Sequence, residues 1–191
     1  MELIKEIKAC RLCEDELPKA PHPVFVLNPK SPFLIVGQAP GLKVHETGIP
    51  WNDASGERLR HWLGIPASSF YNSSMFSIVP IGLCYPGRGK SGDLPPRKEC
   101  SVLWMDTILC EFENLKKLIL VGSYSSQYFL GTGEISDKIR EHATNDSPFI
   151  VLPHPSPRNN IWLKRNEWFE NESIPLIRKK LSLTASLKCG S

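Results

Sequence analysis

Phe33-Leu-Ile-Val36 is the first of four short runs that decide the fold of this 191-residue chain. Three similar runs follow it, namely Phe76-Ser-Ile-Val79, Leu118-Ile-Leu-Val121 and Phe149-Ile-Val-Leu152. Each run is almost continuously apolar rather than alternating, which is typical of strands that are buried on both faces. The sequence therefore predicts four central strands.

Helical patterns with apolar residues three and four positions apart lie between the runs, over residues 56–63, 97–112, 125–130, 135–142 and 167–181, the last with a break near Pro175. In the second of these we expect a buried face made of Val102, Leu103, Met105, Ile108 and Leu109. Strands that alternate with helices predict an α/β fold, a three-layer α/β/α sandwich with a central four-stranded parallel sheet. One domain over residues 1–182 and a flexible C-terminal tail over 183–191 are expected.

Composition excludes several classes of protein. Apolar residues make up 41% of the chain, an ordinary share for a globular protein, and the net charge of +3 permits a nucleic-acid partner without implying one. No apolar run reaches eighteen residues, and charges interrupt the first ten, so we expect neither a membrane partner nor a signal peptide. The expected protein is a cytoplasmic monomer.

Four of the six cysteines have the spacing of a metal site. Cys10 and Cys13 form a C-x-x-C pair, and Cys84 and Cys100 follow with fifteen residues between them. Four thiolates suit zinc or an iron–sulphur cluster equally well. The alternative is that Cys84 and Cys100 are ordinary buried thiols.

The segments that follow the four predicted strands are rich in Gly, Pro and small polar residues: Gly37-Gln-Ala-Pro-Gly41, Pro80 to Gly87, Gly122-Ser-Tyr-Ser-Ser126 and Pro153-His-Pro-Ser-Pro-Arg158. Parallel sheets bind ligands at the carboxyl ends of their strands, where these segments would meet. One such loop would mean little, but four together, one with a histidine, predict a ligand pocket.

Gly37-Gln-Ala-Pro-Gly41 and His154-Pro-Ser156 resemble the two signature motifs of the uracil-DNA glycosylase superfamily. Gly48-Ile-Pro-Trp51 stands where family 4, one of the iron–sulphur branches, has G-x-P-F, and Cys84-Tyr-Pro-Gly87 with Cys100 matches that family's cysteine spacing. The resemblance spans residues 5 to 180. It implies a glycosylase that hydrolyses the N-glycosidic bond of uracil in DNA, with a 4Fe–4S cluster held by the four cysteines and zinc as the alternative occupant.

The resemblance also implies roles for single residues. His154 would donate a hydrogen bond to the uracil oxygen as the base leaves, and Trp51 would stack on the flipped base. Gly37, Ala39 and Ser156 would line the base pocket, and Gln38 would orient a water. Asp53, in a turn that resembles one of family 5, would act as general base or stabilise the sugar cation; the alternative is a helix N-cap.

DNA containing uracil or another deaminated base is the expected partner, which would place the protein at the nucleoid. The loop Arg158-Asn159-Asn160 would enter the duplex, while Arg88, Lys90, Arg97 and Lys98 could meet phosphates. The alternative is that these Lys and Arg side chains are simply exposed to solvent, as is common in loops.

Two departures from the pattern leave alternatives open. Ala39 stands where the best-known branch has an aspartate, and Pro80 stands where family 4 has an asparagine that reads uracil. Hypoxanthine or xanthine are therefore further candidate substrates. A catalytically weak or silent uracil-DNA-binding module and a zinc-stabilised or redox protein unrelated to DNA are the alternative functions.

Overall fold

The computed structural model describes residues 2–90 and 92–186. Its central sheet has four parallel strands in the order β2-β1-β5-β6. The strands are β1 (Phe33–Val36), β2 (Phe76–Ile78), β5 (Lys117–Val121) and β6 (Phe149–Leu152). Almost all of their residues are buried, which explains the continuous apolar runs and confirms the predicted strands and fold class.

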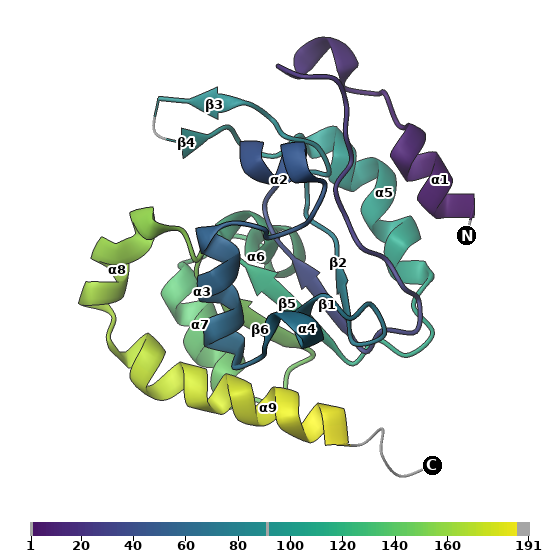
Figure 1. Ribbon diagram of the computed structural model, residues 1–191. Coiled ribbons are helices and arrows are strands. Elements are labelled where there is room, and N and C mark those ends of the chain that lie inside the picture. Colours follow the sequence, from purple (N-terminus) through teal and green to yellow (C-terminus); the bar gives the residue numbers. More distant parts are fainter. Residues whose placement is uncertain (1, 91, 187–191) are drawn as a thin grey trace.

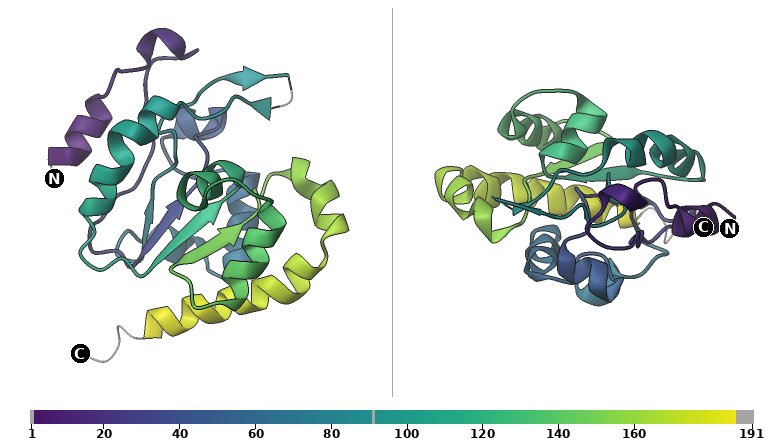
Figure 2. Two further views of the ribbon diagram at one scale, coloured as in Figure 1. Left: turned by 180° about the vertical axis from the view of Figure 1, so that it is seen from behind. Right: turned by 90° about the horizontal axis from the view of Figure 1, so that it is seen from above.

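Helices cover both faces of the sheet (Figures 1 and 2). On one face lie α2 (Leu42–Thr47), α3 (Ala54–Leu63) and α4 (Ala67–Phe70), and on the other lie α5 (Lys98–Cys110), α6 (Ser123–Leu130) and α7 (Ile135–Thr144). The predicted three-layer sandwich is therefore confirmed.

The remaining elements lie around the sandwich: α1 (Glu2–Ala9), the hairpin strands β3 (Arg88–Gly89) and β4 (Gly92–Asp93), and the helices α8 (Asn160–Arg165) and α9 (Ile174–Ser186). A π-helical stretch, Phe169–Ser173, precedes α9, close to the predicted break. Because α9 continues to Ser186, the tail predicted over 183–191 begins inside a helix; residues 187–191 lie outside the described residues. No helix in the described ranges is both long and apolar enough to span a bilayer.

The strand order creates a crevice at the carboxyl edge of the sheet. The chain leaves β1 towards α2 and leaves β5 towards α6, on opposite faces, although β1 and β5 are neighbours. Such a switch point is where open parallel sheets bind ligands. The ladder also continues past the strands, since Ile81 N–H donates to Gly37 O and Gly82 N–H to Gln38 O, each at 2.9 Å. Gly37 and Gln38 are thereby fixed at the crevice.

The predicted buried face of α5 is partly wrong. Met105 and Ile108 are buried as expected, but Val102 is 79% exposed and Leu103 45% exposed. The helix instead turns Ser101, Met105 and Ile108 towards the core, while Cys100 and Trp104 border a separate cavity. One face of α5 thus packs against the core and a second borders this cavity. The remaining face, which carries Val102 and Leu103, is exposed to solvent.

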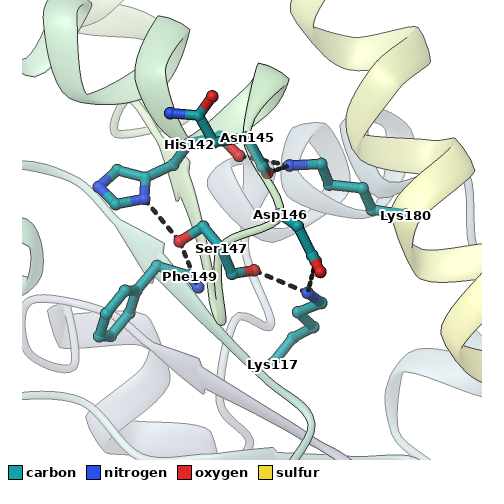
Figure 3. A network of polar contacts seen from close by, with 7 residues as sticks. All are labelled: Lys117, His142, Asn145, Asp146, Ser147, Phe149 and Lys180. Carbon is teal, nitrogen blue, oxygen red and sulfur yellow. Dashed lines mark hydrogen bonds and ion pairs between the residues drawn. The ribbon is translucent and has the colours of Figure 1, made fainter.

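At the opposite, amino edge of the sheet, a polar network fixes the turn between α7 and β6 (Figure 3). The Ser147 hydroxyl lies 2.7 Å from His142 Nδ1 and accepts from Phe149 N–H at 3.0 Å. Lys117 Nζ donates to the Ser147 carbonyl at 2.7 Å. Lys180 of α9 donates to the carbonyls of His142, at 2.7 Å, and Asn145. The network ties α9 to the sheet far from the crevice.

We expect Lys180→Met to lower the free energy of unfolding by about 1–3 kcal/mol, because two carbonyls lose a charged donor. Urea unfolding checks this value. Lys179→Met changes an exposed neighbour and is the control. Equal stabilities of the two variants would show that the network contributes nothing.

Candidate functional site

A cavity of about 460 Å³ opens at the crevice. It is walled by the segments that follow β1 and β6, by the turn before α3 and by the hairpin. Its lining includes nine of the ten pocket and DNA-contact residues expected from the sequence: Gly37, Gln38, Ala39, Trp51, Asp53, His154, Ser156, Arg158 and Asn159. Pro80 after β2 and Tyr124 after β5 also line it, so all four post-strand segments converge as predicted.

His154 lies two residues after the end of β6, and its ring orientation is set by the backbone. Ser156 N–H donates to His154 Nδ1 at 3.2 Å, so this nitrogen is the acceptor and the ring proton lies on Nε2. Gly122, at φ +90°, passes the ring closely: a methyl group there would lie 3.3 Å from His154 Cδ2. The geometry leaves a neutral imidazole with a donor on the side of the ring away from Ser156.

Burial lowers the pKa of His154, and the nearby carboxylates of Asp53 and Asp93 partly oppose this by favouring the charged form. The burial effect prevails, so the imidazole stays neutral at pH 7. A neutral donor suits a leaving group that becomes an anion, because the proton can be shared without being lost to solvent.

Trp51 forms the aromatic wall. Among the described residues, Trp51 is the one non-glycine residue with a positive φ, at 57°. This backbone conformation costs energy when the side chain is bulky. Arg60 Nη1 and the Tyr71 hydroxyl hold it by donating to its carbonyl, at 3.4 and 3.3 Å. The indole lies over Gly37, where a methyl group would be 2.8 Å from Cζ2, and its centroid is 6.0 Å from that of His154.

Asp53 has the capping contact that the alternative interpretation predicted, and it also faces the cavity. It is the N-cap of α3, with Oδ1 accepting from Gly56 N–H at 2.8 Å. It also lines the cavity and acts electrostatically on His154. The cap fixes one carboxylate oxygen and leaves negative charge beside the imidazole.

A second carboxylate, Asp93, was missed by the sequence reasoning. It lies at the end of the β3–β4 hairpin, which projects over the carboxyl edge of the sheet in Figure 1. Gln38 Nε2 donates to the carbonyl of the next residue, Leu94, at 3.3 Å and so fastens the hairpin to the first motif. A methyl group at Gly41 would lie 3.4 Å from Asp93 Oδ2. Asp93 has no sequence motif around it that could have revealed it.

The loop after His154 is braced from α3. Arg58 Nη1 donates to Ser156 O at 3.3 Å and to Asn160 Oδ1 at 2.8 Å. Asn159 Nδ2 donates to the His154 carbonyl at 3.0 Å. Asn159 and Asn160, expected to contact DNA, therefore have internal partners, and Asn160 lies outside the cavity lining. Arg58 was another residue that the sequence did not single out.

Arg158, also expected at the DNA, lines the cavity and packs against Gly92, whose φ is +141°. Tyr124 contributes to the lining as well. It could have been found, because it lies in the segment after the third strand.

A second, smaller cavity has all four predicted metal ligands, Cys10, Cys13, Cys84 and Cys100, on its wall. Apolar residues complete most of the lining, and Leu83 N–H donates to Cys100 Sγ at 3.3 Å. Burial raises the pKa of Cys84 to about 11 and that of Cys100 to about 12. Thiols so placed need a cationic partner to ionise.

The four thiols share this cavity. Among residues 2–90 and 92–186, no three His, Cys, Asp or Glu side chains are grouped as a single metal ion would require. Zinc–sulphur bonds of about 2.3 Å would hold four sulphurs within about 4 Å of one another. Cys110 is exposed and Cys189 lies outside the described residues. Arg97 borders this cavity and pairs with Glu16.

A family model described as the uracil DNA glycosylase superfamily matches residues 24–178. The matched segment contains all four sheet strands and every residue of the larger cavity. It begins after Cys10 and Cys13, so it does not reach half of the thiol set.

Proposed function

The chain belongs to the uracil DNA glycosylase superfamily, and from that premise we propose that it excises uracil from DNA by hydrolysing the N-glycosidic bond. Membership supports a glycosylase-type activity on DNA; uracil as the substrate and action as a monomer are our proposals. The observation that carries the proposal is the cavity in which a neutral His154, the Trp51 ring and two carboxylates meet.

His154 has the properties that the leaving group demands. As the bond between the base nitrogen and the sugar C1′ breaks, both electrons go to the base, and negative charge develops on its carbonyl oxygen. The Nε2–H of His154 is available to donate to that oxygen, because Nδ1 is already engaged by Ser156. The donor is oriented before the reaction starts, which is the condition for strong electrostatic stabilisation.

The carboxylates serve the other half of the reaction. The sugar gains positive character as the base departs, and a water must then add to C1′ and lose a proton. Asp53 and Asp93 both line the cavity and supply negative charge for the cation and an acceptor for the proton. We assign the principal role to Asp53, which is held in the cavity wall by its bond to Gly56 N–H, whereas Asp93 is exposed on the hairpin. These two residues replace the carboxylate that the first motif lacks at Ala39.

Base recognition follows from the walls of the cavity. The base must leave the duplex stack to reach His154, and Trp51 offers a flat apolar surface on which it can stack. Pro80 lines the cavity without a backbone N–H. The wall where family 4 carries its asparagine thus has no side-chain amide, so we propose that selectivity among deaminated bases is relaxed.

The test is a glycosylase assay on oligonucleotides that carry a single uracil, hypoxanthine, xanthine or thymine, in single- and double-stranded form. Base release, seen as strand cleavage after alkali, is expected with uracil and absent with thymine. Tight binding to uracil-containing DNA without release would identify a silent binding module instead. A protein that neither binds uracil-containing DNA nor releases uracil from it would refute the proposal.

We further propose that the four cysteines hold a 4Fe–4S cluster, as in the iron–sulphur branch that the sequence resembles. The four thiols line one largely apolar cavity, and their spacing in the sequence is that of the iron–sulphur branch. Such a cluster would fasten the N-terminal segment to α5 and to the stretch that leads into the hairpin. Iron and sulphide analysis tests this: Cys84→Ser is expected to lose iron and Cys110→Ser to keep it, whereas stoichiometric zinc would contradict the cluster.

The lowered pKa of His154 predicts a pH profile. An ordinary histidine is half protonated near pH 6.5, whereas His154 should remain neutral there, so turnover should stay constant as the pH falls from about 8 to 6.5 and decline only below. Between the unfolded and folded pKa values the unfolded chain binds more protons, so the contribution of His154 to stability decreases as the pH falls through this window. A turnover already halved at pH 6.5 would contradict this assignment.

A further inference from the structure

Two hydrogen-bond donors beside the four-cysteine cavity have no acceptor. In the described chain, three buried side-chain nitrogens lack a hydrogen-bond partner: His45 Nδ1, Arg97 Nε and Trp104 Nε1. Arg97 and Trp104 both line the cavity that holds Cys10, Cys13, Cys84 and Cys100. Buried N–H groups in proteins nearly always have a hydrogen-bond acceptor. Two buried N–H groups without one, on residues that line the same cavity, indicate that an acceptor is missing from it.

One helix presents both donors. Arg97 is the N-cap of α5, Cys100 follows three residues later and Trp104 four residues after that, so all three lie on one side of the helix. Arg97 is held in place by Glu16 and, at 3.3 Å, by Glu99. Its guanidinium also faces the thiol of Cys13: burial raises the pKa of that thiol, and Arg97 opposes the rise.

The remaining lining offers no other side-chain acceptor. Besides the cysteines, Arg97 and Trp104, it consists of Leu12, Leu17, Pro21, Pro23, Gly82 and Leu83. Sulphur atoms are therefore the side-chain acceptors in this lining, and the Leu83 N–H already donates to one of them.

We propose that Arg97 and Trp104 donate N–H···S hydrogen bonds to the sulphurs of the cluster site and thereby raise the reduction potential of the cluster. This inference rests on the cluster proposed above. Reduction adds negative charge to the sulphurs, and donors that point at them stabilise the reduced state more than the oxidised one. The positive charge of Arg97 acts in the same direction.

The experiment uses the iron-loaded protein and its variants Trp104→Phe and Arg97→Lys. Trp104→Phe removes an N–H and keeps an aromatic ring; Arg97→Lys keeps the charge and removes the Nε donor. Trp168→Phe is the matched control, because its N–H donates to Asn166 Oδ1, at 2.9 Å, away from the cysteines. Iron content, midpoint potential and the iron–sulphur stretching bands in the resonance Raman spectrum are measured for each.

We expect both variants to shift the potential to more negative values and to alter the stretching bands, with Trp168→Phe unchanged. The Raman bands report the hydrogen bonds even if the cluster is not reversibly reduced. Wild-type bands and potential in a fully iron-loaded Trp104→Phe protein would overturn this inference and leave the cluster proposal intact. A wild-type protein without iron would overturn the cluster proposal itself, and neither result bears on uracil release.

Discussion

Replacing His154 with alanine is expected to lower the turnover number for uracil release about 100- to 1,000-fold, the usual loss when one preorganised donor to a developing anion is removed. The reason is the fixed tautomer: Ser156 N–H occupies Nδ1 and leaves Nε2–H for the base. Alanine removes that donor without adding a group that could replace it. Single-turnover kinetics on a uracil-containing oligonucleotide measure the chemical step without product release.

A control separates this loss from a general effect of removing histidine. His61 lies on α3 with an exposed side chain. We expect His61→Ala to keep wild-type turnover and both variants to unfold at similar urea concentrations. Near wild-type turnover in His154→Ala would remove His154 from the reaction and with it the proposed mechanism.

Asp53→Asn is expected to reduce turnover about 100- to 10,000-fold, the range for loss of a general base. Asparagine is as good an N-cap as aspartate, so the α3 cap to Gly56 should persist while the charge is lost. Asp53→Ala loses both the charge and the N-cap hydrogen bond. Besides the loss of turnover, we therefore expect its free energy of unfolding to be about 0.5–2 kcal/mol lower than that of the wild type. Comparing the two variants by kinetics and by urea unfolding separates catalysis from capping. Full activity in Asp53→Asn would leave the residue with a structural role alone.

Asp93→Asn tests the second carboxylate in the same assay. Asp93 is exposed at the end of the hairpin, and its effect on His154 is smaller than that of Asp53, so a smaller loss is expected. If the two carboxylates share one function, the losses in the double variant should not be additive. A larger loss in Asp93→Asn than in Asp53→Asn would reverse the assignment of roles.

Local chemistry made much of the fold predictable. The runs at β1 and β6 matched the observed strands residue for residue, because a strand buried on both faces needs an unbroken apolar stretch. The exposed Val102 and Leu103 show the limit of the same reasoning. A period of 3.6 residues places side chains on one side of a helix, but the neighbours packed against α5 decide which side is buried.

The sequence by itself determined the parallel sheet, the segments that converge at its carboxyl edge, and the identity of His154, Asp53 and Trp51 as residues of one pocket. The sheet and the converging segments follow from the strand period, and the three pocket residues follow from motifs that resemble those of the superfamily. Only the tertiary structure brought Asp93 to the same pocket, turned the His154 proton to Nε2 and placed Arg97 and Trp104 beside the four thiols. The physical reason is that burial, tautomer and electrostatic field depend on neighbours distant in the chain, which become neighbours only when the domain has folded.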